Sequence, residues 1–171
     1  MFTYKLSHES GLNFTVGYIN ASDAVTDVSY SDVGITYTGM DGLTIGAAMS
    51  NNTIGNNIDS DESTMYATYA TGGFTVGVQS SDLDHTTANS DQESIAYGVT
   101  YAVNDDLSIG YSYHELDFES TSLADQESTG VSASYTMGGM TLAGAMNSVD
   151  AMDGVATGDY EGYEFNLKFA F

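Results

Sequence analysis

The sequence predicts an all-β protein, an antiparallel up-and-down meander of about eleven strands that forms one domain over residues 1–171. Three observations predict this fold. A motif repeats about every 30 residues, apolar and small residues alternate along each segment, and turn-forming residues separate the segments in pairs.

The repeated motif is an apolar residue, then Thr or Ser, an apolar residue and a small residue. Its copies begin at Phe14, Leu43, Phe74, Leu107 and Met140. A tight turn rich in Gly, Asn or Asp precedes each of the last four copies, and these residues tolerate the positive φ of hairpin turns. Each repeat is therefore predicted to be a β-hairpin.

Alternation with a period of two extends along both arms of each hairpin. In one arm, Ile95, Tyr97 and Val99 alternate with Ala96 and Gly98. Such a segment has one apolar face and one face of small residues. The expected strands lie near residues 2–8, 12–19, 28–38, 43–50, 63–71, 74–81, 93–102, 107–115, 128–136, 140–148 and 162–171.

Three features favour a transmembrane β-barrel over a soluble sandwich. Short turns alternate with long connections, expected near residues 20–27, 51–62, 82–92, 116–127 and 149–161. The polar face consists of Gly, Ala, Ser and Thr, which suit a water-lined interior. Tyr37, Tyr69, Tyr101 and Tyr135 occupy the short-turn end of the apolar face, as an interfacial aromatic girdle would.

Charge and motifs exclude several function classes. Two basic residues against 24 acidic ones give a formal charge of −22, which repels nucleic acid. The three histidines, His8, His85 and His114, are scattered, and none belongs to a nucleophile motif such as Gly-x-Ser-x-Gly. No enzymatic activity is expected.

The last strand is the most specific local signal. Its apolar face consists of Tyr163, Phe165, Leu167, Phe169 and Phe171, and the sequence ends on that phenylalanine. This pattern resembles the terminal strand of Gram-negative outer-membrane proteins, which serves as the signal for the barrel assembly machinery.

The whole chain resembles the C-terminal two-thirds of a general porin of the alphaproteobacterial type. The resemblance implies an outer-membrane location among lipid and lipopolysaccharide, a homotrimer, and a water-filled channel for passive diffusion of ions and small hydrophilic solutes. It also implies a 16-stranded barrel, with about five strands before Met1. The odd number of expected strands also indicates missing strands, because bacterial single-chain barrels have an even number of strands.

Alternation assigns seven larger polar residues to the lumen face, where we expect them to line the pore. A charge facing lipid near the membrane midplane would cost about 2–4 kcal/mol, which supports this orientation. Lys168 and Glu164 could alternatively form a local ion pair. The seven residues are Lys5, Asp32, Gln79, His114, Glu164, Asn166 and Lys168.

Most of the acidic residues fall in the expected long connections. They either solvate an exposed rim or attract cations to the pore mouth. Asp59, Asp61 and Glu62 are the densest group and a candidate for loop-bound Ca²⁺ or Mg²⁺; no other cofactor is expected. The remaining acidic residues assigned to these connections are Asp23, Asp27, Asp82, Asp84, Asp91, Asp117, Glu119, Asp125, Glu127, Asp150, Asp153, Asp159 and Glu161.

Two other functions remain open from the sequence. A non-channel outer-membrane barrel could act as an adhesin or structural protein through its acidic loops. Small lumen residues favour the channel, because a plugged barrel packs large side chains inside. A secreted calcium-stabilised β-solenoid is disfavoured, because its repeat is near nine residues. The acidic composition predicts a preference for cations.

Overall fold

The computed structural model describes residues 2–20, 28–54 and 58–170, which form eleven β-strands and one short 3₁₀ helix. The strands are β1 (Phe2–Ser7), β2 (Leu12–Ile19), β3 (Val28–Met40), β4 (Leu43–Ile54), β5 (Ile58–Thr71), β6 (Phe74–His85), β7 (Gln92–Ala102), β8 (Leu107–Phe118), β9 (Gln126–Met137), β10 (Met140–Asp150) and β11 (Tyr160–Phe169), and the helix is η1 (Met152–Gly154). Among these residues, no helix is long and apolar enough to cross a membrane.

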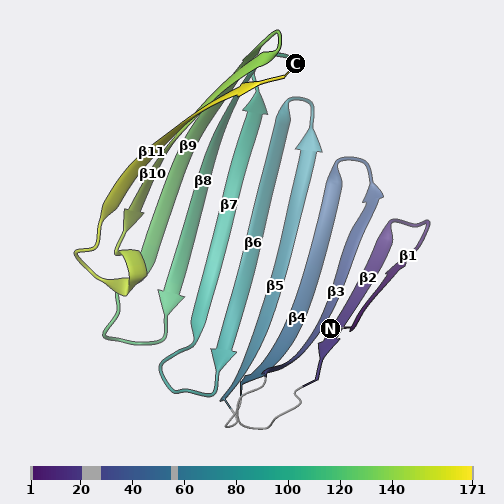
Figure 1. Cartoon of the computed structure of the whole chain (residues 1–171), viewed down its shortest axis with the longest axis vertical. Helices are drawn as coiled ribbons and strands as arrows, with labels where there is room; N and C mark the ends of the chain where they lie inside the picture. Colours follow the sequence, from purple (N-terminus) through teal and green to yellow (C-terminus); the bar gives the residue numbers. More distant parts are fainter. Residues whose placement is uncertain (1, 21–27, 55–57, 171) are drawn as a thin grey trace.

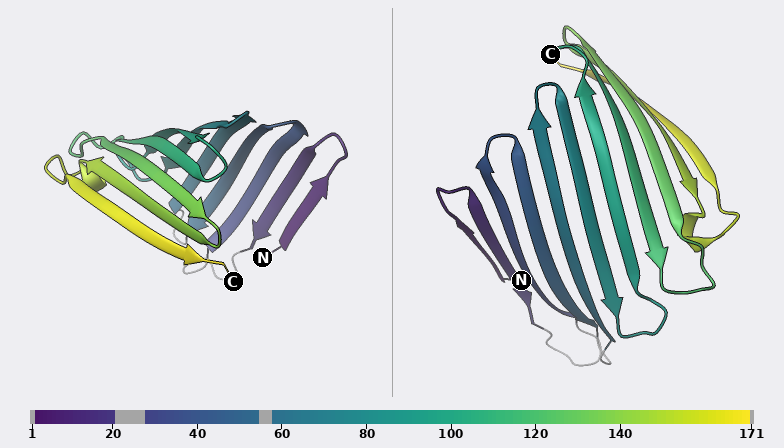
Figure 2. Two further views of the ribbon diagram at one scale, coloured as in Figure 1. Left: turned by 90° about the horizontal axis from the view of Figure 1, so that it is seen from above. Right: turned by 180° about the vertical axis from the view of Figure 1, so that it is seen from behind.

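All eleven strands belong to one sheet in sequence order, and each pairs antiparallel with its neighbours along the chain (Figure 1). The predicted meander is therefore confirmed, with the predicted number of strands. The sheet is strongly curved, and both edges, β1 and β11, turn toward the same side (Figure 2). Each edge strand has a pairing partner on one side only within the described residues.

The prediction of long connections was wrong for much of their length. The stretch 51–62, expected to be a loop, instead continues the β4–β5 ladder as far as the pair Ile54 and Ile58. Within it, the Asn51 side-chain amide donates to the Asp61 carboxylate at 2.7 Å. Backbone pairing needs no apolar side chains, so the strands extend into polar sequence that alternation cannot identify.

Nine acidic residues assigned to connections consequently lie in strands, whereas Asp91, Glu119, Asp125, Asp153 and Asp159 do lie in connections or in η1. Asp23 and Asp27 lie outside the described residues. The nine are Asp59, Asp61, Glu62, Asp82, Asp84, Asp117, Glu127, Asp150 and Glu161.

The short turns are joined to the neighbouring hairpins by backbone hydrogen bonds. The Ala70 N–H donates to the Gly42 carbonyl at 2.8 Å, and the Ala170 N–H donates to the Gly139 carbonyl at 2.7 Å. Gly42 has φ +73°, and an added Cβ there would overlap the Ala70 carbonyl oxygen. Glycine at this turn thus satisfies both a backbone conformation and a close approach between hairpins.

Replacing Gly42 with alanine is expected to lower the free energy of unfolding by about 2 kcal/mol or more, because left-handed strain and steric overlap combine. Gly72→Ala is the matched control: Gly72 has φ +57°, but nothing lies within 4 Å of an added Cβ. Only the backbone penalty of about 1 kcal/mol applies there. Urea unfolding in detergent micelles measures both variants, and equal losses would contradict this account.

Candidate functional site

The convex face of the sheet carries the apolar side chains at matched levels. Each of the four predicted girdle tyrosines pairs with the first residue of a neighbouring strand: Tyr37 with Leu12, Tyr69 with Leu43, Tyr101 with Phe74 and Tyr135 with Leu107. Phe169 continues this row on β11 by pairing with Met140. The rings of Phe74 and Tyr101 stack with centroids 4.3 Å apart.

These apolar side chains have no protein core to pack into. Among the described residues, no large side chain is fully buried, and the one buried hydrophobic residue is Ala151. On the convex face, Val76 remains 46% exposed and Phe165 71% exposed. An apolar face this extensive marks contact with a partner or with hydrocarbon rather than with water.

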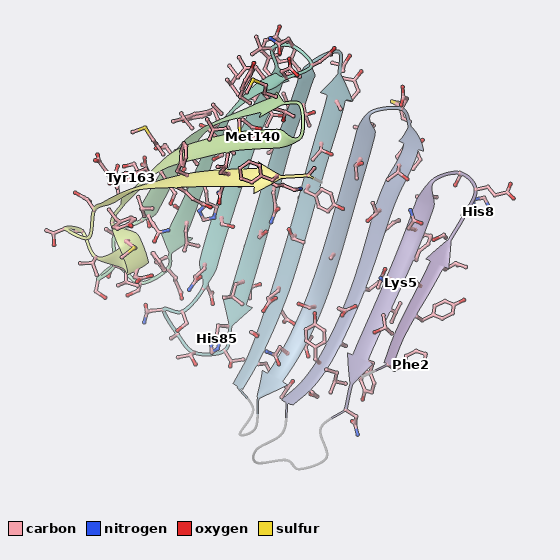
Figure 3. All side chains as sticks on the ribbon, turned by 45° about the horizontal axis from the view of Figure 1, so that its top comes forward. Phe2, Lys5, His8, His85, Met140 and Tyr163 are labelled. Atoms are coloured by element: carbon pink, nitrogen blue, oxygen red, sulfur yellow. The ribbon has the colours of Figure 1, made fainter. Side chains whose placement is uncertain are left out.

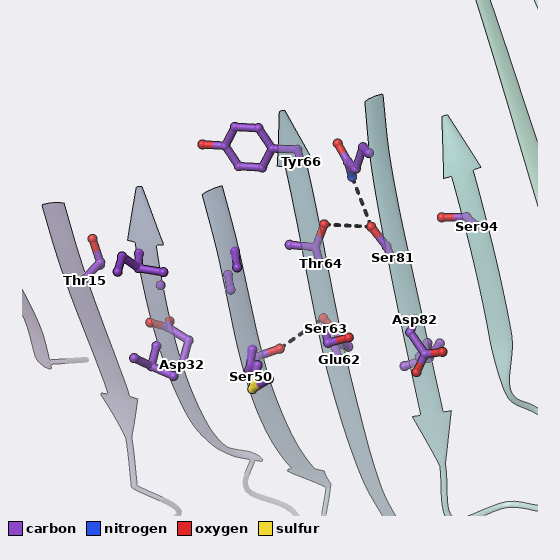
Figure 4. A pocket seen from close by; sticks show the side chains of 18 of the residues that line it. Thr15, Asp32, Ser50, Glu62, Ser63, Thr64, Tyr66, Ser81, Asp82 and Ser94 are labelled. Atoms are coloured by element: carbon purple, nitrogen blue, oxygen red, sulfur yellow. Dashed lines mark hydrogen bonds between the residues drawn. The ribbon is translucent and has the colours of Figure 1, made fainter. Parts of the chain in front are cut away.

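The concave face is hollow and polar. A depression of about 670 Å³ extends from β2 to β8 and can lie only inside the curve of the sheet (Figure 4). Its lining includes the hydroxyl groups of Thr64 and Ser81, which are 2.8 Å apart, and the Gln79 amide, which donates to Ser81 at 3.1 Å. A second depression of about 580 Å³ includes Gln79 and His114.

All seven residues assigned to the lumen share this concave face. Asp32, Gln79 and His114 line the depressions. The other four lie on the edge strands, where Lys5 pairs with Thr15, Glu164 with Ala145, Asn166 with Ala143 and Lys168 with Thr141. Figure 3 labels Lys5 on β1. Glu164 accepts its hydrogen bond from the Asn166 amide, so the alternative ion pair with Lys168 is not the observed contact.

Several large polar residues of the concave face were missed from the sequence, among them Glu62, Tyr66 and Asn147. Glu62 was assigned to a connection, although it pairs with Ser50 and accepts a hydrogen bond from that hydroxyl at 3.3 Å. Tyr66 and Asn147 also line the depressions. Counting by twos from Tyr69, which lies on the convex face, would have placed Tyr66 on the concave one.

Glycines on the concave face lie beneath larger side chains from neighbouring strands. Gly46 pairs with Tyr66, and an added Cβ at Gly46 would overlap the tyrosine ring. Asp32 lies in the same way over its partner Gly17. The large polar side chains therefore lie along the wall instead of projecting into the hollow.

The three candidate metal ligands, Asp59, Asp61 and Glu62, do not point toward one common site. Asp59 and Asp61 are an even number of residues from Tyr69 and face the convex side, whereas Glu62 faces the concave side. Over residues 2–20, 28–54 and 58–170, no group of three or more His, Asp or Glu side chains is arranged to hold a metal ion.

Three solved structures with a similar fold are distant in sequence from this chain. An anion-selective porin from Comamonas acidovorans matches with a TM-score of 0.80 and 16% identity, over 99% of this chain and 58% of that one. OmpT from Vibrio cholerae matches with a TM-score of 0.66 and 16% identity, over 98% and 62%. A triple mutant of the Rhodopseudomonas blastica porin matches with a TM-score of 0.67 and 20% identity, over 99% and 54%.

The chain thus spans about three fifths of the length of these structures. No curated protein matches the sequence. The sequence profile of a family described as Gram-negative porin matches residues 1–125, which is well over half of the chain. The chain therefore belongs to the Gram-negative porin family and is a β-barrel protein of the bacterial outer membrane.

Proposed function

We propose that the chain forms the wall of a water-filled channel for passive diffusion of ions and small hydrophilic solutes. The observation that carries the proposal is the inverted distribution of side chains: apolar residues cover the convex face, while Ser, Thr, Gly and a few charged residues line the concave one. Water can fill such a concave surface, and hydrocarbon can cover such a convex one. Selectivity then arises from lumen charge and width, without covalent chemistry.

The fixed charge favours cations. Asp32, Glu62 and Glu164 lie on the concave face against two lysines, in a chain whose formal charge is −22. Clustered charge of one sign in a confined space raises the local concentration of counter-ions. The Comamonas acidovorans relative is anion-selective; the charge of this chain supports the opposite preference here.

The barrel needs pairing at both sheet edges, because an unpaired strand edge is not tolerated in hydrocarbon. Further strands of a longer protein or another chain would supply it, and family membership supports assembly as a homotrimer surrounded by lipid and lipopolysaccharide. The aromatic row Tyr163, Phe165, Leu167 and Phe169 lies on the convex face of β11, where the barrel assembly machinery could read it. Phe171 lies outside the described residues.

Reconstitution of the complete protein into a planar bilayer is expected to give stepwise, cation-preferring conductance. Properly inserted protein that passes no current would instead favour an adhesin or structural barrel. The chain offers a matched pair for the charge argument: Glu62 faces the hollow, while its neighbour Asp61 on β5 faces the convex side.

Glu62→Gln is expected to lower the cation-to-anion permeability ratio roughly twofold, since a unit charge about 8 Å from a permeating ion contributes roughly 0.5 kcal/mol in water. Asp61→Asn removes the same charge from the opposite face and should leave the ratio nearly unchanged. Reversal potentials in a salt gradient measure both, and a larger effect of Asp61→Asn would refute the assignment of faces.

Gly46→Ala is expected to lower single-channel conductance by roughly a fifth, because it lifts one aromatic ring from the wall into a lumen that small residues otherwise leave open. Gly34→Ala is the control, because an added Cβ there meets the Ala48 side chain at an ordinary 3.6 Å. Single-channel recording compares the two variants. Unchanged conductance in Gly46→Ala would show that Tyr66 does not limit the pore.

A further inference from the structure

The charged residues of the concave face are sorted along the strands. Asp32, Glu62 and Glu164 are each the fifth residue of their strand, counted from the end opposite the short turns. Lys168 and Lys5 lie at the opposite ends: Lys168 is second from the end of β11, and Lys5 is third from the end of β1, beside the first short turn.

The pairing confirms that Lys168 lies near a short turn. Lys168 pairs with Thr141, the second residue of β10, which begins directly after the turn at Gly138 and Gly139. Asp32 and Glu62 instead flank Ser50, far along β4 from its first residue, Leu43. The sheet therefore has a lumenal acidic end and a lumenal basic end.

Within residues 2–20, 28–54 and 58–170, the other charges do not remove this polarity. The long connections add Asp91, Glu119, Asp125 and Asp159 to the acidic end. Four acidic residues, Glu9, Asp41, Asp105 and Asp106, lie in the short turns, where all are exposed. They lie on the rim, where bulk water and salt screen them most effectively, whereas both lysines lie within the strands and face the lumen.

The separation is large enough for ions to sense the two ends separately. Lys168 and Glu62 differ by eight residues in their distance from the short-turn ends of β11 and β5, which at about 3.3 Å per residue on tilted strands is roughly 20 Å along the axis. That exceeds the Debye length of about 10 Å in 0.1 M salt. Each end thus gathers its own counter-ions, cations at the acidic end and anions at the basic end.

We propose that the channel conducts small inorganic ions asymmetrically and passes more current when the long-connection side is positive. At that polarity, the cations gathered at the acidic end and the anions gathered near the lysines are both driven into the lumen. The opposite polarity withdraws both and depletes the lumen of carriers. This inference rests on the proposed channel function and assigns that channel a preferred direction of current.

The test uses the complete protein in planar bilayers with KCl on both sides and compares currents at equal and opposite voltages. The orientation of the protein in the bilayer is determined with the variant Asn89→Cys. Asn89 lies in the connection after β6, and a thiol reagent that cannot cross the membrane reaches it from one side only. The expected current ratio is roughly 1.5 in 0.1 M KCl and falls toward one in 1 M KCl, where the Debye length is about 3 Å.

The variant Lys5→Gln/Lys168→Gln should bring the ratio close to one and increase cation preference. Lys168→Arg keeps the charge and should keep the ratio, which guards against a variant that merely folds poorly. Asp61→Asn, on the convex face, should also leave it unchanged. Absence of any conductance would refute the proposed channel itself. Open channels with a symmetric current, or a ratio that survives removal of both lysines, would overturn only the present inference.

Discussion

The continuous antiparallel hydrogen-bond ladder from β1 to β11 is the constraint on which the rest of the structure depends. Because side chains alternate faces along every strand, the register of one strand pair fixes the faces of the next. A shift of one residue in any pair would bring apolar residues to the hollow and charges to the convex side. The girdle row from Tyr37 to Phe169 stays on the convex face across the hairpins, even past the register shift between Tyr37 and Met40 at the β3–β4 turn.

The ladder also accounts for how the fold manages without a core. In a soluble domain, burial of apolar side chains in the interior supplies most of the stabilisation. Here the described residues contain no large buried side chain, so the apolar convex face must gain its stabilisation from the surrounding hydrocarbon. Glycine can therefore occupy positions on the concave face that are covered by a large polar side chain from a neighbouring strand. Gly46, which lies beneath Tyr66, is one such position. Width and fixed charge in the lumen thus depend on pairs of residues across strands.

Much of the fold could be predicted from the sequence, because strand number, facing and turns depend on local patterns. The hairpin turns at Gly42 and Gly72 follow from turn chemistry, and the concave-face position of Lys5 and Lys168 follows from alternation. The outer strand ends could not be predicted, since polar residues such as Asn51 and Asp61 have weak strand preference and are held there by pairing with a neighbour. Glu62 was missed for the same reason, and the contact between Gly46 and Tyr66 depends on cross-strand register.

The central claim is that the convex face meets hydrocarbon and the concave face meets water, and cysteine accessibility tests it most directly. The chain has no cysteine, so single cysteines can replace Val78 and Gln79, adjacent residues on opposite faces of β6. In protein reconstituted into liposomes, a charged thiol reagent is expected to modify Gln79→Cys readily and to leave Val78→Cys unmodified. The reverse order of reactivity, or equal modification of both, would contradict the account.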